Sequence, residues 1–193
     1  NIFWTRCYEP WRIKRDRKIK KYFNDQNVNV NTFNGSLLWE PWNIAKKDGT
    51  PYKVFTPYYR KGCLNSDKPR MPLPVPNLSN LISIDNHDLK IEDLELMPKH
   101  NWYNKMISLW SPGEEGALNK IEEFISNGLN NYKEGRNFPS NQNVSQLSPH
   151  LHFGEVSPNQ VWYRAKTKEG KLGIKKDLDH FLSELGWREF SFN

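Results

Sequence analysis

Three residues near the end of the chain carry side chains that could recognise a flat, polar partner. Glu184, Trp187 and Arg188 recur at the spacing that gathers residues on one side of an α-helix. An apolar stripe with the same spacing lies about a third of a turn away: Leu178, Phe181, Leu182 and Leu185. We expect the stripe to face a core, and the indole between a carboxylate and a guanidinium to meet something flat and polar.

A second group of candidate residues lies in the segment SQLSPHLHFGEVSPNQVW, residues 145–162. Ser148-Pro149 and Ser157-Pro158 each have the form of an N-cap followed by proline at the first helical position, and Gly154 suits the end of the first helix. Free backbone N–H groups at a helix start favour an anion such as phosphate. Ordinary helix capping explains the same pairs without a ligand, so both interpretations stay open.

Other reactive residues give weaker signals. Tyr132 and Arg136 follow an expected helix and could edge a nucleotide site, although such residues are also common at surfaces. His150 and His152 would point to different sides of a helix, and without a third ligand nearby they predict no metal site. The chain has neither dinucleotide nor P-loop glycine motifs and no spacing typical of a hydrolytic triad. An enzyme built from it would therefore depend on a bound cofactor.

The elements that must position these residues fall into three parts. The first 35 residues alternate strand, helix and strand patterns, which predicts an α/β layer over residues 1–63. Residues 64–110 are rich in proline and irregular, so we expect a linker there. In the motif SPGE, Ser111 as N-cap and Glu114 as its partner predict a capping box that opens a helical part over residues 111–193.

The composition of the chain limits which binding partners and which cell compartment we expect. Among 193 residues, 28 Lys and Arg against 22 Asp and Glu give a net charge of +6 and a pI near 9.2, which favours a polyanionic partner or simply a solvated basic surface. Cys7 and Cys63 fit neither a disulfide framework nor a metal site, so we expect the reducing cytosol. No long apolar run or signal peptide is present. The chain starts without methionine and stops within a helical pattern, so we expect a fragment of a longer protein.

Several motifs in order resemble the DNA photolyase and cryptochrome family, in particular its microbial class I cyclobutane pyrimidine dimer photolyases. They are YEPWRIKRD, LLWEP, GTPYKVFTPYYR, LSPHLHFGEVSP and FLSELGWREF, and they span nearly the whole chain. The resemblance implies an α/β fold, the end of a Rossmann-like antenna domain at residues 1–63, followed through the linker by the first helices of an all-α FAD-binding domain at residues 111–193.

The resemblance also implies roles for individual residues. Glu184 and Trp187 match the residues that meet the damaged bases, the first by hydrogen bonding if protonated and the second by stacking. Arg136 and Arg188 match positions along the DNA-binding rim, together with Glu184 and Trp187. The positions expected to contact FAD are Tyr132, Val144, Ser145, Gln146, Leu147, Ser148 and Phe181. No metal is implied.

The implied activity is light-driven DNA repair by a deoxyribodipyrimidine photolyase, in which reduced FAD passes an electron to a pyrimidine dimer. Photolyases are among the enzymes that extrude their target bases from the duplex. We expect a monomer, free of membranes, in the bacterial cytosol and nucleoid, and an inactive fragment. Val144 and Gln146 depart from the threonine and the arginine or glycine usual in the family, which bears on FAD affinity. Folate-binding relatives have a carboxylate near the position of Arg12, so a folate, a deazaflavin or no antenna pigment stays open.

Two other functions remain open at this point. A cryptochrome would keep FAD and signal in blue light without repairing DNA. A basic nucleic-acid-binding module without cofactor is suggested by the seven basic residues between Arg12 and Lys21.

Overall fold

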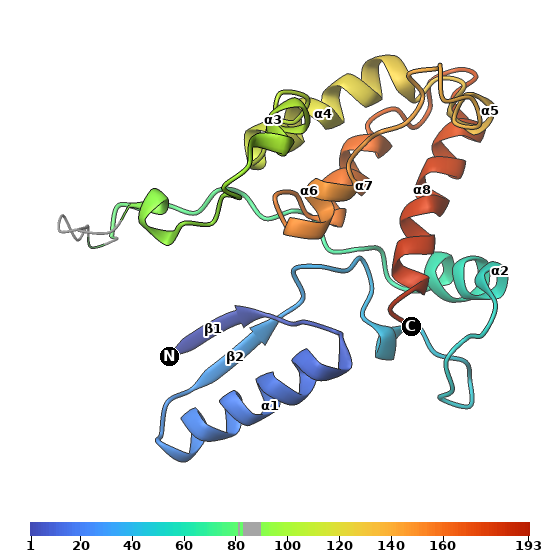
Figure 1. Cartoon of the computed structure of the whole chain (residues 1–193). Coiled ribbons are helices and arrows are strands. Elements are labelled where there is room, and N and C mark those ends of the chain that lie inside the picture. The colour runs from blue at the N-terminus through green and yellow to red at the C-terminus, as the bar shows by residue number, and fades with distance from the viewer. Residues whose placement is uncertain (81, 83–89) are drawn as a thin grey trace.

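The computed structural model describes residues 1–80, 82 and 90–193. It is mostly helical with one small parallel sheet (Figure 1). Strand β1 (Ile2–Thr5) leads into α1 (Pro10–Asp25), which returns the chain to β2 (Val30–Phe33). The two strands pair in parallel with Ile2 opposite Val30, and parallel strands need such a crossover. The expected strand, helix and strand order is confirmed.

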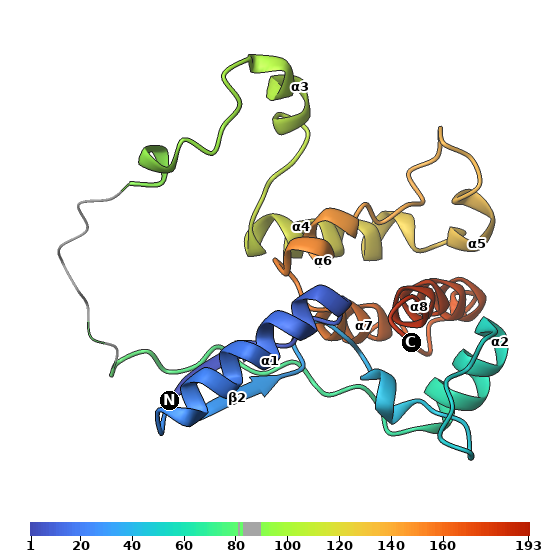
Figure 2. The same ribbon diagram turned by 60° about the horizontal axis from the view of Figure 1, so that its bottom comes forward.

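The chain then crosses to the helical part. Helix α2 (Phe55–Pro57) continues through a π-helical turn over Tyr58–Gly62 and a 3-10 turn over Cys63–Asn65. After an extended stretch, short turns at Ile91–Leu94 and Asn101–Tyr103 precede α3 (Asn104–Ile107). Figure 2 shows α3 lying away from the body of the molecule. Residues 81 and 83–89 of the expected linker lie outside the described residues, and the boundaries of the three expected parts stay predictions.

Five helices and their connecting turns form the helical part. They are α4 (Glu114–Glu123), which continues through a π-helical turn over Phe124–Gly128, α5 (Tyr132–Gly135), α6 (Ser148–Phe153), α7 (Pro158–Lys166) and α8 (Lys175–Phe190). The stripe on α8 is buried as expected and faces the core with Ile121 and Phe124. Helix α8 packs against α5 and α7, so the residues on its remaining faces are held by one rigid element.

Two of the expected helix starts lie elsewhere. Helix α4 begins at Glu114 after Gly113, whose φ of 97° turns the chain, so the capping box of Ser111 does not form. Helix α6 includes Ser148 as its first residue, and Leu147 occupies the N-cap position. Both starts move because a residue with positive φ makes the turn instead of a capping serine. Ser157 forms its capping box with Gln160, and Gly154 ends α6 at a φ of 73° as expected.

A buried carboxylate joins the two parts of the molecule. Glu189 on α8 is only 2% exposed. Its Oε2 accepts hydrogen bonds from the backbone N–H groups of Leu38 at 2.7 Å and Trp39 at 3.3 Å, and its Oε1 accepts one from Arg188 Nη1 at 2.9 Å. Burial raises the pKa of Glu189 to about 7, although Arg188 and the two N–H groups oppose the rise. The segment after β2 is therefore tied to the same helix that carries the candidate site.

Among the described residues, no helix combines the length and apolarity needed to cross a bilayer.

Replacing Gly116 in α4 tests how the SPGE turn packs. A Cβ atom at this position would lie 1.7 Å from the carbonyl oxygen of Ser111, which is backbone and cannot swing away. We expect Gly116→Ala to lower the free energy of unfolding by about 1–3 kcal/mol, despite a gain in helix propensity of about 1 kcal/mol. Chemical denaturation measures this, with the exposed Asn119→Ala as control. Equal stability of both variants would contradict the packing.

Titration of Glu189 predicts how stability depends on pH. Because its pKa is raised from 4.5 to about 7 on folding, the folded state keeps a proton that the unfolded state has lost between these values. The contribution of Glu189 is therefore fully present below about pH 4.5 and is lost as pH rises through about 7. We expect Glu189→Gln to flatten the fall in unfolding free energy over this range, in denaturation series on the whole protein that carries this sequence. The exposed Glu169→Gln should keep the wild-type slope, and the prediction fails if Glu189→Gln keeps it too.

Candidate functional site

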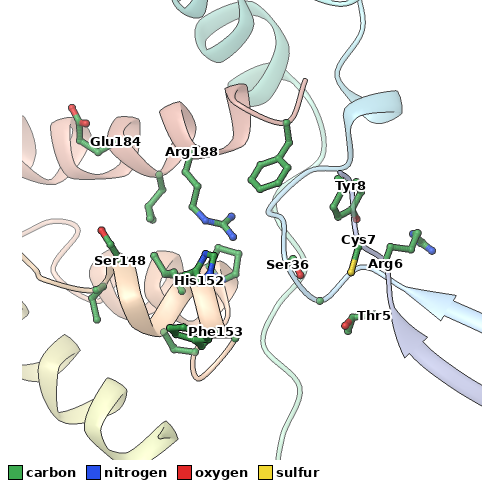
Figure 3. A pocket seen from close by; sticks show the side chains of 18 of the residues that line it. Thr5, Arg6, Cys7, Tyr8, Ser36, Ser148, His152, Phe153, Glu184 and Arg188 are labelled. Atoms are coloured by element: carbon green, nitrogen blue, oxygen red, sulfur yellow. The ribbon is translucent and has the colours of Figure 1, made fainter. Parts of the chain in front are cut away.

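One cavity of about 860 Å³ lies between the two parts of the molecule (Figure 3). Its volume falls within the range of about 300–1,000 Å³ typical of ligand sites. On one side lie the residues that follow β1 and the turn after β2, including Tyr8, Arg12 and Ser36. The other side comes from α5, α6, α8 and the segment before α6. We call this the central cavity.

The segment before α6 and the first residue of α6 each bring one serine to the central cavity. Gln146 has a φ of 53°, which is rare for a residue other than glycine. Ser145, Leu147 and Ser148 line the cavity, whereas Val144 and Gln146 do not. Neither serine hydroxyl makes a hydrogen bond within the described part of the chain, so both can accept a polar ligand. Residues 144–148, five of the seven expected to contact the cofactor, are thus divided into three that line the cavity and two that do not.

The phosphate hypothesis for the second Ser-Pro pair loses its support. The Ser157 hydroxyl accepts the backbone N–H of Gln160 at 3.1 Å and donates to the side chain of Gln160 at 2.9 Å. It does not line the central cavity. Capping alone accounts for this serine.

Two buried aromatic residues form the wall behind the serines. Tyr132 and Phe181 meet edge to face, with ring centroids 5.4 Å apart. Phe124 packs against both. Burial raises the pKa of Tyr132 to about 12, which keeps its hydroxyl neutral at ordinary pH. This wall offers an apolar surface and one neutral hydroxyl to a flat ligand.

A half-buried ion pair connects α5 to α8 at the edge of the cavity. Arg136 Nη1 lies 2.5 Å from Glu184 Oε1, and both side chains are 30% exposed. The guanidinium also lies over the Tyr132 ring and 3.4 Å from His180 Nε2. The hydrogen bond with Glu184 raises the pKa of Arg136. Glu184 Oε2 makes no hydrogen bond among the described residues and keeps a free acceptor.

The expected polar face of α8 is divided between two directions. Glu184 and Arg188 line the central cavity, but Trp187 does not. Figure 3 shows Arg188 reaching toward the α6 side of the cavity, while the Glu184 carboxyl group points the other way. Trp187, 47% exposed, stacks on Phe55 of α2 with centroids 3.8 Å apart and an angle of 12°. Trp187 therefore does not share the central cavity with Glu184 and Arg188, because its ring turns toward α2, and the roles expected for the three residues stay predictions.

The histidines have separate environments. His150 is buried, bonded through Nδ1 to Glu155 Oε2 at 2.5 Å, and packs near Trp110. His152 lines the central cavity. In residues 1–80, 82 and 90–193, no group of three or more His, Cys, Asp or Glu side chains could hold a metal ion.

Sequence reasoning missed the far end of the cavity and the ring beneath Trp187. Glu40 accepts hydrogen bonds from Arg6 and Tyr8, each at 2.7 Å, and burial raises the pKa of Tyr8. These residues lie more than thirty positions from Glu40, so no local pattern links them. Phe55 is separated from Trp187 by most of the chain, and only the motif GTPYKVFTPYYR drew attention to its segment.

Comparison with known proteins identifies the family. Residues 1–77 match the family model described as DNA photolyase. The deoxyribodipyrimidine photo-lyase of Agrobacterium fabrum is 36% identical over 193 residues, which are all of this chain and 40% of that protein. Cryptochrome-1 of Arabidopsis thaliana is 31% identical over 98% of this chain and 29% of its own length.

A solved structure agrees with these relatives. The crystal structure of a bacterial class III photolyase from Agrobacterium tumefaciens matches with a TM-score of 0.90 and 36% identity, over 98% of this chain and 39% of that one. The motifs suggested class I, so the subclass stays a prediction. This chain spans about 40% of the length of these photolyases. It belongs to the DNA photolyase and cryptochrome family.

Proposed function

We propose that the whole protein that carries this sequence is a deoxyribodipyrimidine photolyase, which uses light to split cyclobutane pyrimidine dimers in DNA. One observation carries the proposal: the central cavity gathers Tyr132, Ser145, Ser148, Phe181 and Glu184 from segments far apart in the chain. The curated relatives named deoxyribodipyrimidine photo-lyase support the same activity.

The residues of the central cavity fit a flavin nucleotide. The hydroxyls of Ser145 and Ser148 have no partner within the described residues and suit phosphate oxygens, and Arg188 adds a positive charge. Tyr132 and Phe181 would face the flat ring system. Leu147 would pack beside them, whereas Val144 and Gln146 would act through the shape of the turn. When bound, FAD in its reduced state would supply the light absorption and the electron for dimer splitting.

Glu184 would recognise the damaged bases through its side-chain oxygens. Its Oε1 is paired with Arg136, which leaves Oε2 for a base. The free Oε2 can accept the N3–H of a thymine, which needs no proton on Glu184. Arg136 and Arg188 would attract the phosphates beside the lesion. Trp187 would replace stacking that the extruded bases lose, worth about 1–3 kcal/mol per base.

The remaining expectations follow from the family and stay proposals. Residues 1–63 would be the end of a Rossmann-like antenna domain, and residues 111–193 the start of the all-α FAD-binding domain. Arg12, the residue that bears on folate binding, lines the central cavity, and the expectation for the antenna domain remains a folate, a deazaflavin or no pigment. The protein would act as a monomer in the cytosol, bound to DNA that contains pyrimidine dimers.

A cryptochrome is the second candidate, favoured by the 31% identity to Cryptochrome-1 over 98% of this chain. Blue-light illumination of dimer-containing DNA with the purified, flavin-reduced whole protein separates the two functions. Loss of dimers in the light but not in the dark supports photolyase activity. Unchanged dimers with a fully loaded flavin support a photoreceptor. Absence of any flavin, with salt-sensitive binding to undamaged DNA, supports a basic binding module.

Trp187→Ala tests the recognition of the lesion. We expect affinity for an oligonucleotide with one thymine dimer to fall about tenfold, because a stacking ring is lost. The flavin content should stay near wild type, since Trp187 does not line the central cavity. Fluorescence anisotropy and flavin absorbance measure the two quantities. Trp11→Ala, on exposed α1, is the matched control with wild-type affinity. A variant that loses flavin would show that the ring is structural.

A further inference from the structure

We propose that Phe55 is a positioning residue for Trp187, which backs one face of the indole so that only the other face can receive an extruded base. This inference rests on the proposed function, because it assigns Phe55 to the same recognition step. Phe55 belongs to α2, and both Figure 1 and Figure 2 place that helix beside the C-terminal half of α8.

Three nearly parallel rings form an aromatic column, Tyr59, Phe55 and Trp187. The Phe55 and Trp187 centroids are 3.8 Å apart at 12°, and the Tyr59 and Phe55 centroids are 5.5 Å apart at 11°. Tyr59 is buried, whereas Trp187 at the other end is 47% exposed. In the described part of the chain, no further ring stacks on the second face of Trp187. Trp187 is therefore the exposed member of the column.

The packing around the column fixes its direction. Phe190 meets both Phe55 and Trp187 at steep angles, 68° and 77°, and so bounds the column from the side. Gly186 lets Tyr59 approach α8, since a Cβ atom there would lie 2.5 Å from the Tyr59 ring. The indole is thus held by neighbours from α2 and from its own helix. An indole held in this way loses less conformational entropy on binding a base than a freely rotating one.

The neighbours of the open ring suit a base. Glu184 lies one helical turn before Trp187 and keeps Oε2 free, and Arg136 lies beside that carboxylate. A base that stacks on Trp187 would find an acceptor and a cation within one turn of α8. Without Phe55, the Trp187 indole could turn either face to solvent. Only a fraction of the molecules would then hold the indole in the orientation that receives a base.

The test uses the whole protein with bound flavin and an oligonucleotide carrying one thymine dimer. We expect Phe55→Leu to weaken dimer binding about two- to tenfold, the range that the loss of one aromatic pair implies. Flavin content and binding to undamaged DNA should stay at wild-type values. Phe55→Tyr, which keeps the ring, should restore the affinity. Phe33→Leu removes another exposed aromatic residue, at the end of β2, and should change neither quantity.

A double-mutant comparison separates positioning from stability. In the Trp187→Ala background, Phe55→Leu should have no further effect on dimer binding, because the ring that it positions is gone. Equal losses in both backgrounds would overturn the proposal, and so would wild-type dimer affinity of Phe55→Leu. Wild-type protein that does not prefer dimer-containing DNA would overturn the proposed function together with this inference. A third outcome would overturn the inference alone. In it, the wild-type protein prefers dimer-containing DNA over undamaged DNA, Trp187→Ala loses this preference and Phe55→Leu keeps it.

Discussion

The arrangement of the central cavity depends on one buried carboxylate. Glu189 accepts the N–H groups of Leu38 and Trp39, which would otherwise be buried without partners, and so fixes the segment after β2 against α8. Burying an acid costs free energy, and its raised pKa records that cost. The same group holds the guanidinium of Arg188, which lines the cavity. Glu189 therefore contributes both to the packing of the two parts and to the position of a charged side chain at the cavity.

Helix α8 makes a different kind of contact on each of three faces. Leu178, Leu182 and Leu185 fill the core and determine how the helix packs. Glu184 and Arg188 line the central cavity, with the Arg188 side chain reaching toward α6 and the Glu184 carboxyl group pointing the other way. Trp187 turns outward to the ring of Phe55. Because the apolar face anchors the helix, the other two faces can present polar and aromatic groups without contributing to the core.

The periodicity of the sequence correctly predicted those structural features that depend on residues close together in the chain. The strand, helix and strand of the first 33 residues, the buried stripe of α8 and the cap at Ser157 all follow from local patterns. The starts of α4 and α6 did not, because positive φ at Gly113 and Gln146 leaves no clear trace in a single sequence. The neighbours of Trp187 also escaped prediction, because Phe55 reaches it only through the packing of α2 on α8.

Glu184 has one carboxyl oxygen without a hydrogen bond among the described residues, and this affects how a lesion would be recognised. Its pair with Arg136 is about one-third exposed, and pairs of this kind contribute only about 0–1 kcal/mol. A base that bonds to Oε2 leaves the contact at Oε1 in place, so binding need not break the pair. Arg136 would then hold the carboxylate in the orientation that receives the base. In the proposed recognition step, the pair with Arg136 would therefore hold the Glu184 carboxyl group in place, and Phe55 would hold the stacking ring of Trp187.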